Sequence, residues 1–134
     1  MKKSKKELVE ARLKKSEEAL AMALMGAEKK YWNSSASALY YSCYYLVHAL
    51  FAEYEIDAHT HAGTKTLFSS EFIKQNIIEE RWGKLLSNLF RYRQDADYGD
   101  FPIINESIIV PLIPEVKEFD KIVRHLLSQK NKSL

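Results

Sequence analysis

Apolar residues recur three and four positions apart along most of this 134-residue chain, with Lys, Glu and other polar residues between them. That spacing follows the 3.6-residue turn of an α-helix with one buried face. The strict alternation that marks strands is scarce, and the chain has only four Gly and three Pro. The pattern predicts an all-α protein, a single domain over residues 1–134 with a disordered tail at about 129–134.

Five helical segments follow from this pattern, with the residue ranges 4–30, 35–54, 64–75, 79–96 and 105–127. Tyr31–Ser34 interrupts the spacing between the first two, and Asn33 or Ser34 is a suitable N-cap for the second helix. Pro111 and Pro114 fall inside the last segment, where a proline removes a main-chain hydrogen bond. They predict either a kink or a helix that begins near Pro114.

The second helical segment has no charged residue from Ser35 through Ala52. A helix that is apolar or small all round is normally covered on most sides, so we place it at the centre of the fold or across an oligomer interface. Several small residues would let a neighbouring helix approach it closely: Ala36, Ala38, Ser42 and Ala49. Four tyrosines add bulk, and their hydroxyls need partners wherever they are buried.

The net charge of +2 is too small to indicate a polyanion as partner, but the positive charge is unevenly distributed. Seven basic residues lie near the start of the chain: Lys2, Lys3, Lys5, Lys6, Arg12, Lys14 and Lys15. They indicate either the frayed, solvated start of a helix or a weak contact surface for nucleic acid.

The single cysteine, Cys43, excludes a disulfide within the chain and fits a reducing compartment. Its apolar, Tyr-rich surroundings predict a buried structural thiol. The first residues contain no apolar signal-peptide region, and no apolar run reaches the length needed to cross a membrane. We therefore expect a cytoplasmic protein with no membrane partner.

Three sequence features together resemble the HEPN family, in its branch of short stand-alone bacterial and archaeal proteins. The segment Ser37–Leu50 has small residues, then Tyr-Tyr, then an apolar helix. His61 is followed after a short spacer by Phe68 and Phe72. Arg93–Asp100 is similar to the branch's Arg-x-x-Ala-Asp-Tyr signature in both order and spacing. The resemblance covers nearly the whole chain.

This resemblance implies an antiparallel four-helix up-and-down bundle with an additional short helix, usually as a dimer. It also implies a partner, because members of the family often act with a small nucleotidyltransferase in two-component toxin–antitoxin or defence systems. The uncharged span of the second segment favours a homodimer independently, since it offers more apolar surface than a half-exposed helix needs.

Many HEPN proteins are metal-independent RNases that carry Arg, four to six residues, and then His. No His follows Arg91 or Arg93 at that spacing, and Asp97 and Tyr98 stand where it would be. His supplies an acid–base group near neutral pH, which Asp and Tyr supply only after a large pKa shift. Whether the chain is an enzyme stays open, and the departure argues against it.

The most specific motif also contains the candidate ligand site. Arg93 and Asp97 are four residues apart, so they can pair on one face of a helix. They are either a structural ion pair or an anion site in which Arg93 binds a phosphate or nucleotide. We predict that Arg93, Asp97 and Tyr98 meet at one cleft, with Arg91 assisting. His61 is expected either to make a structural bond or to contact this cleft.

The histidines are the other candidate ligands. His59 and His61 form a His-x-His pair in a predicted loop with Asp57 nearby, but a metal site normally needs three or four ligands. We therefore expect no bound metal and no other cofactor. His48 is expected to be a satisfied core residue, and His125 suits the end of the last helix.

The leading interpretation is a HEPN-like module that binds nucleotide or RNA phosphate and pairs with a minimal nucleotidyltransferase. Two alternatives stay open. One is a metal-independent RNase that uses Arg93 with Asp97 or Tyr98. The other is a non-catalytic dimerising adaptor whose interface is the Tyr-rich helix.

Overall fold

The computed structural model describes residues 4–100 and 103–132. Its elements, in chain order, are α1 (Lys5–Glu28), α2 (Trp32–Tyr54), α3 (His61–Phe68), the π-helical turn η1 (Ser69–Ile73), α4 (Glu80–Tyr98) and α5 (Glu106–Lys132). The described residues contain no strand, so the all-α prediction is confirmed.

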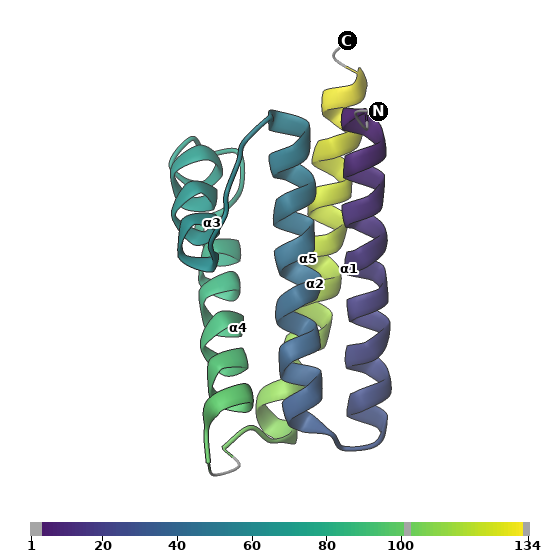
Figure 1. Ribbon diagram of the computed structural model, residues 1–134, viewed down its shortest axis with the longest axis vertical. Helices are drawn as coiled ribbons and strands as arrows, with labels where there is room; N and C mark the ends of the chain where they lie inside the picture. The colour runs from purple at the N-terminus through teal and green to yellow at the C-terminus, as the bar shows by residue number, and fades with distance from the viewer. Residues whose placement is uncertain (1–3, 101–102, 133–134) are drawn as a thin grey trace.

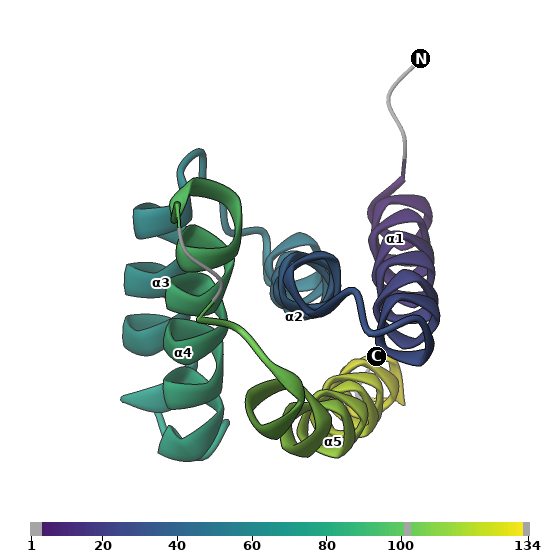
Figure 2. The same ribbon diagram turned by 90° about the horizontal axis from the view of Figure 1, so that it is seen from below.

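The four long helices alternate in direction, α1 and α4 running one way and α2 and α5 the other (Figure 1). The end-on view shows α2 in the middle, with α1 on one side, α4 and α3 on the other, and α5 along a third (Figure 2). Contacts agree, because α2 packs against α1, α4 and α5. Within the described residues, no helix covers the remaining side of α2, which faces the viewer in Figure 1. The central place expected for the uncharged helix is confirmed, and one side of it remains open.

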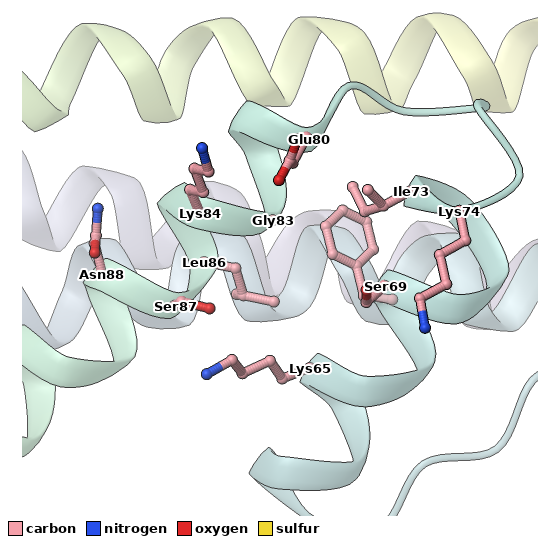
Figure 3. A pocket seen from close by; sticks show the side chains of 11 residues that line it. Lys65, Ser69, Ile73, Lys74, Glu80, Gly83, Lys84, Leu86, Ser87 and Asn88 are labelled. Carbon is pink, nitrogen blue, oxygen red and sulfur yellow. The ribbon is translucent and has the colours of Figure 1, made fainter.

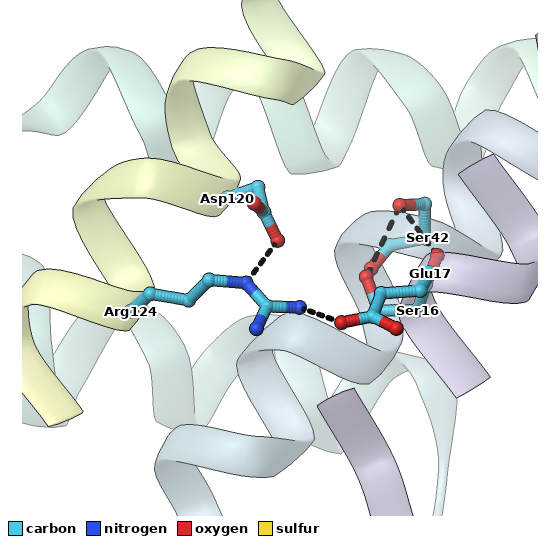
Figure 4. Close-up of polar contacts among 5 residues, drawn as sticks. All are labelled: Ser16, Glu17, Ser42, Asp120 and Arg124. Carbon is cyan, nitrogen blue, oxygen red and sulfur yellow. Dashed lines mark hydrogen bonds and ion pairs between the residues drawn. The ribbon is translucent and has the colours of Figure 1, made fainter. Parts of the chain in front are cut away.

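The seam between α1 and α2 is close because small residues line it. The hydroxyl of Ser16 donates to the main-chain carbonyl of Ser42 at 2.8 Å, and that of Ser42 donates to the carbonyl of Ser16 at 3.2 Å (Figure 4). Ser35 donates in the same way to the carbonyl of Ala23 at 2.7 Å. Each buried hydroxyl thus finds a partner on the opposite helix, which avoids the cost of an unpaired polar group.

Helix α5 is joined to α1 at the surface by Arg124. Its Nη2 donates to Glu17 at 2.8 Å and its Nε donates to Asp120 at 3.0 Å (Figure 4). All three side chains are at least a quarter exposed, so each pair contributes about 0–1 kcal/mol. Burial of Ile109, Val116 and other apolar residues of α5 supplies most of the attachment.

The start of α2 differs from the prediction. The helix begins at Trp32, and its N-cap is Tyr31 without a side-chain cap, so Asn33 and Ser34 lie in the first turn. The connection from α1 to α2 is too short to leave Asn33 and Ser34 outside the second helix. Lys30 takes a left-handed conformation (φ 62°), and the N–H of Tyr31 donates back to the carbonyl of Gly26 at 2.8 Å.

Helix α3 also begins earlier than predicted, at His61 instead of Thr64. Thr60 is the N-cap, and its hydroxyl accepts a hydrogen bond from the N–H of Gly63 at 2.8 Å. His61 is therefore the first residue of a helix and does not lie in a loop. Helix α4 ends at Tyr98, and Gly99 follows in an extended conformation (φ −79°) that any residue can adopt.

The prolines of α5 neither delay nor interrupt it. The helix starts at Glu106, well before Pro114, and continues through Pro111 and Pro114 to Lys132. Its start is secured by Asn105, whose side chain accepts from the N–H of Ile108 at 3.2 Å. Residues 129–132 are helical where a disordered tail was predicted, and 133–134 lie outside the described residues, as do Lys2 and Lys3 of the basic start.

Candidate functional site

The open side of α2 carries a strip of half-buried residues that we call the tyrosine face: Ser37, Ala38, Tyr41, Tyr44 and Tyr45. These positions fall on one side of the helix because 3.6 residues make a turn. The three rings contact one another, with centroids 6.0 Å apart for Tyr41 and Tyr44 and 5.4 Å apart for Tyr44 and Tyr45. An open groove of about 740 Å³ runs beside this face, between α1 and the end of α4.

Arg93 of α4 borders the tyrosine face and is held by two side chains. Its Nε donates to Oδ2 of Asp97 at 3.1 Å, which confirms the predicted i, i+4 pair. The other oxygen of Asp97 accepts a hydrogen bond of 2.7 Å from Ser37 of α2. Both carboxylate oxygens are occupied, so Asp97 positions the guanidinium and ties α4 to α2.

The terminal nitrogens of Arg93 lack the acceptor that its Nε has. No described residue accepts a hydrogen bond from Nη1 or Nη2. The guanidinium carbon lies 5.4 Å from the ring centre of Tyr41 and 5.9 Å from that of Tyr40, within cation–π range. The side chain is only 14% exposed. A partly desolvated guanidinium with two free donor nitrogens suits an anion such as phosphate.

His61 reaches the same site from α3. Its Nδ1 lies 2.6 Å from the hydroxyl of Tyr40, and its ring packs against Tyr44 and Phe90. Burial, then the charges of Tyr44 and Tyr41, raise the pKa of Tyr40 well above its usual 10, so its hydroxyl stays protonated. Burial, and next the charge of Arg93, lower the pKa of His61 below 6.5. At neutral pH both groups are therefore uncharged, and the short hydrogen bond between the hydroxyl and Nδ1 joins α2 to α3.

Two basic residues of α1 border the tyrosine face on its other side. Arg12 donates from Nη1 to the main-chain carbonyl of His48 at 2.7 Å. The amine of Lys15 lies 5.4 Å from the ring centre of Tyr45. The face thus has positive charge along both borders and aromatic rings between them, a combination typical of surfaces that bind single-stranded nucleic acid.

His48 lies beneath this face as the predicted core residue. It is buried, and its Nε2 lies 2.9 Å from the hydroxyl of Thr64, which in turn donates to the carbonyl of Thr60. Nε2 must therefore carry the proton in that bond. Burial, then the charges of Arg12 and His61, lower the pKa of His48 to about 4.

The lowered pKa of His48 in the folded protein predicts a loss of stability in mild acid. Its pKa is 6.5 when unfolded and about 4 when folded, so the unfolded chain binds the proton more tightly between these values. The contribution of neutral His48 is complete above pH 6.5 and is lost as the pH falls towards 4. The melting temperature should drop over this window, and drop less in His48→Gln, which keeps an N–H donor. Parallel melting curves for the two proteins across that range would contradict the assignment.

Two predicted residues make no contact with this site. Tyr98 is 71% exposed and makes no hydrogen bond or ring contact to a described residue, so its place at a cleft with Arg93 and Asp97 stays a prediction. It follows Asp97 by one residue, which turns it about 100° around the helix. Arg91 is exposed, with its guanidinium 5.3 Å from the ring centre of Tyr92. It lies two residues from Arg93 and so on another face of α4.

Sequence reasoning missed Ser37, Tyr41, Arg12 and Lys15 as members of this site. The signal for the first two was available, because residues 37, 41, 44, 45 and 48 share one side of a helix. The sequence showed Arg12 and Lys15 only as part of the basic start of the chain, because their place beside the tyrosine face depends on how α1 packs against α2. The described residues contain no group of three or more His, Cys, Asp or Glu that could hold a metal ion.

No helix within the described ranges is long and apolar enough to cross a membrane. The buried thiol expected at Cys43 is confirmed, because this residue is fully covered within α2, where burial raises the pKa of the thiol.

Comparison with known proteins places the chain among its relatives. The model of the HEPN domain matches residues 9–126. A protein of Methanocaldococcus jannaschii named "Putative toxin MJ0142" is 33% identical over 94 residues, which are 70% of this chain and 63% of that protein, so the chain spans less than two thirds of it. Another from the same organism, "Putative toxin MJ0605", is 27% identical over 125 residues, 91% of this chain and 93% of that protein. Since the family model covers most of the chain, this protein belongs to the HEPN domain family.

Proposed function

We propose that the tyrosine face binds the phosphate groups of a nucleotide or single-stranded RNA, with Arg93 as the anchor. The observation that carries this proposal is the state of Arg93. Asp97 and Ser37 hold one edge of its guanidinium, and Nη1 and Nη2 have no acceptor among the described residues. Two parallel N–H donors match two phosphate oxygens in spacing and direction.

The surroundings of Arg93 support a nucleic-acid ligand over a simple anion. Tyr41, Tyr44 and Tyr45 present half-buried rings on which bases can stack. Lys15, on the opposite border, can reach a second phosphate along the backbone. Stacking on aromatic rings between basic borders is sequence-tolerant, so we expect little preference among bases.

The biological role that we propose is the toxin of a two-component toxin–antitoxin or defence pair in the cytoplasm. Two relatives carry names that describe them as toxins. We further infer that the chain acts as a homodimer and that its antitoxin is a small nucleotidyltransferase. The exposed apolar residues Met22, Met25 and Tyr31, at one end of α1 and the turn after it, are suited to a protein interface.

The structure supports ligand binding at this site better than it supports the alternative, an RNase that uses Asp97 or Tyr98 as a catalytic residue. Each oxygen of Asp97 already accepts a hydrogen bond, from Arg93 or from Ser37, so a ribose hydroxyl would have to compete with these two donors. Tyr98 points to solvent away from this pair. A general base must lie within hydrogen-bond reach of the proton that it removes.

Growth of a bacterial host tests the toxin proposal. Induced expression of the wild-type chain should slow growth, and Arg93→Ala at equal protein level should relieve the effect. Arg91→Ala is the matched control and should remain toxic. Co-expression of a small nucleotidyltransferase encoded beside the gene should restore growth. If wild type and Arg93→Ala affect growth equally, the role given to Arg93 is wrong. Broken cellular RNA on a gel would instead favour the RNase alternative.

A further inference from the structure

A second groove, of about 600 Å³, is formed by the start of α1, the end of α2 and the end of α5. It lies on the side of α2 that faces away from α3 and α4 (Figure 1). We propose that this groove binds a free α-amino acid with an aliphatic side chain. At neutral pH such a molecule carries an ammonium and a carboxylate group on one carbon. Three features of the groove match its three parts.

The first feature is Glu53, a buried carboxylate without a partner. Glu53 lines the groove from the last turn of α2 and is only 6% exposed. No described residue donates a hydrogen bond to it or forms an ion pair with it. Burial of an unpaired charge costs free energy, and the partial negative charge at the C-terminal end of a helix adds to that cost. The ammonium group of a ligand would offset both.

The second feature is Arg124 of α5, which supplies a donor of opposite charge to the same groove. Its Nε donates to Asp120 and its Nη2 to Glu17 (Figure 4), but no described residue accepts a hydrogen bond from Nη1. The two carboxylates hold the guanidinium in place, so a ligand can bond Nη1 without ordering a flexible side chain. A hydrogen bond from a guanidinium to the carboxylate of an amino acid is charge-assisted and stronger than a neutral one.

The third feature is an apolar lining from two helices. Val9 and Leu13 of α1 are four residues apart and so lie on one side of that helix, and Leu127 of α5 also lines the groove. Val9 and Leu127 are buried, and Leu13 is half-buried against the core. A branched aliphatic side chain would cover these groups and leave water with them. Pockets of this volume with an apolar lining and a few placed polar groups are typical of small-molecule sites.

The remaining charges of the groove favour a ligand with no net charge. Lys5, Lys6 and Glu10 are exposed at its rim, so two lysines stand against the carboxylates of Glu10 and Glu53. The charge of Arg124 is offset by its two carboxylate partners. A diamine would be repelled by the lysines, and a phosphate monoester, with nearly two negative charges, by the carboxylates. An amino acid zwitterion avoids both costs.

Titration of the ¹⁵N-labelled full chain with L-leucine, followed by the chemical shifts of the amide groups, tests the proposal. The shifts should saturate with a Kd of about 1 mM or below and should lie at the start of α1 and the ends of α2 and α5. Three relatives of leucine each lack one part of the molecule: glycine the side chain, isoamylamine the carboxylate and 4-methylpentanoate the amine. Each should bind about tenfold or more weakly than leucine.

Two variants remove the charged contacts. Glu53→Gln and Arg124→Gln should each weaken leucine binding about tenfold or more. Without leucine, Glu53→Gln should melt at the same temperature as wild type or higher, because a neutral amide costs less to bury than an unpaired carboxylate. The pairs lost in Arg124→Gln are partly exposed, so this variant should still fold.

Three further variants are controls and should bind leucine like wild type. Glu71→Gln removes an exposed carboxylate of η1, and Lys84→Gln removes a lysine from a different groove, the one between α3, η1 and α4 (Figure 3). Arg93→Ala separates this inference from the function proposed above, because the amino acid groove shares no lining residue with the groove beside the tyrosine face.

Three results would overturn the inference. One is the absence of shifts in wild type up to about 10 mM leucine. Another is the loss of leucine binding in Arg93→Ala, which would place the ligand on the tyrosine face. The third is a lower melting temperature of Glu53→Gln with unchanged leucine binding, which would mean that Lys5 or Lys6 pairs with Glu53 in solution and that Glu53 only stabilises the fold.

Discussion

Replacement of Arg93 by alanine should weaken the binding of a short single-stranded RNA about tenfold or more, with little change in stability. A hydrogen bond to a charged group is worth about 1.5–3 kcal/mol, and about 1.4 kcal/mol corresponds to a factor of ten. The lost Arg93–Asp97 pair contributes only about 0.3–0.5 kcal/mol to folding, because it is an i, i+4 pair at a partly exposed helix end. Asp97 retains its hydrogen bond from Ser37 in the variant.

Fluorescence anisotropy with a labelled oligonucleotide measures this effect, beside thermal melts followed by circular dichroism. Affinity should fall as salt is raised from about 50 to 200 mM, because phosphate contacts release counterions. Arg91→Ala is the matched control, an arginine of the same helix on another face. Arg93→Lys should recover only part of the affinity, since an ammonium cannot make two parallel bonds. If Arg93→Ala instead lowers the melting temperature strongly and leaves RNA binding unchanged, the Arg93–Asp97 pair only stabilises the fold.

Replacement of Phe119 by alanine should lower the free energy of unfolding by about 3–5 kcal/mol. Phe119 is 1% exposed on α5, and its ring centre lies 6.0 Å from that of Phe68 and 5.5 Å from that of Trp82. It thereby joins α5 to rings from both α3 and α4. Small domains are stable by about 5–15 kcal/mol in total, so the loss is large and should loosen the α3–α4 flank first.

Urea unfolding of wild type and variants measures the loss. Val110→Ala on the same helix removes a half-exposed side chain and should change stability by less than about 0.5 kcal/mol. Phe119→Leu keeps most of the apolar volume and should lose less than the alanine variant. Hydrogen exchange in α3 and α4 should rise before exchange in α2. A loss below about 1 kcal/mol for Phe119→Ala would mean that the core closes over the cavity, contrary to the packing described.

Local features of this protein could be read from its sequence because their causes are local. Helix formation follows the 3.6-residue spacing, and the Arg93–Asp97 pair follows from two residues that are four positions apart on one helix. The central place of α2 follows from its lack of charge between Ser35 and Ala52, since an uncharged helix must be covered on most sides. Helix ends were less accurate. The third helix begins at His61 and not at Thr64, because Thr60 caps it through a hydrogen bond from the residue three positions on, which the periodicity does not show.

The composition of the candidate site was decided only by the tertiary structure. Arg93 faces Ser37 and Tyr41 because α4 packs along one side of α2, and Arg12 and Lys15 border the same face because α1 packs along the other. Tyr98 matched the motif but points to solvent, because helical rotation separates it from Asp97 whatever the motif contains. Spacing along one helix sets which residues share its face. Which face stays open, and which charges from other helices border it, depends on packing between segments far apart in the chain.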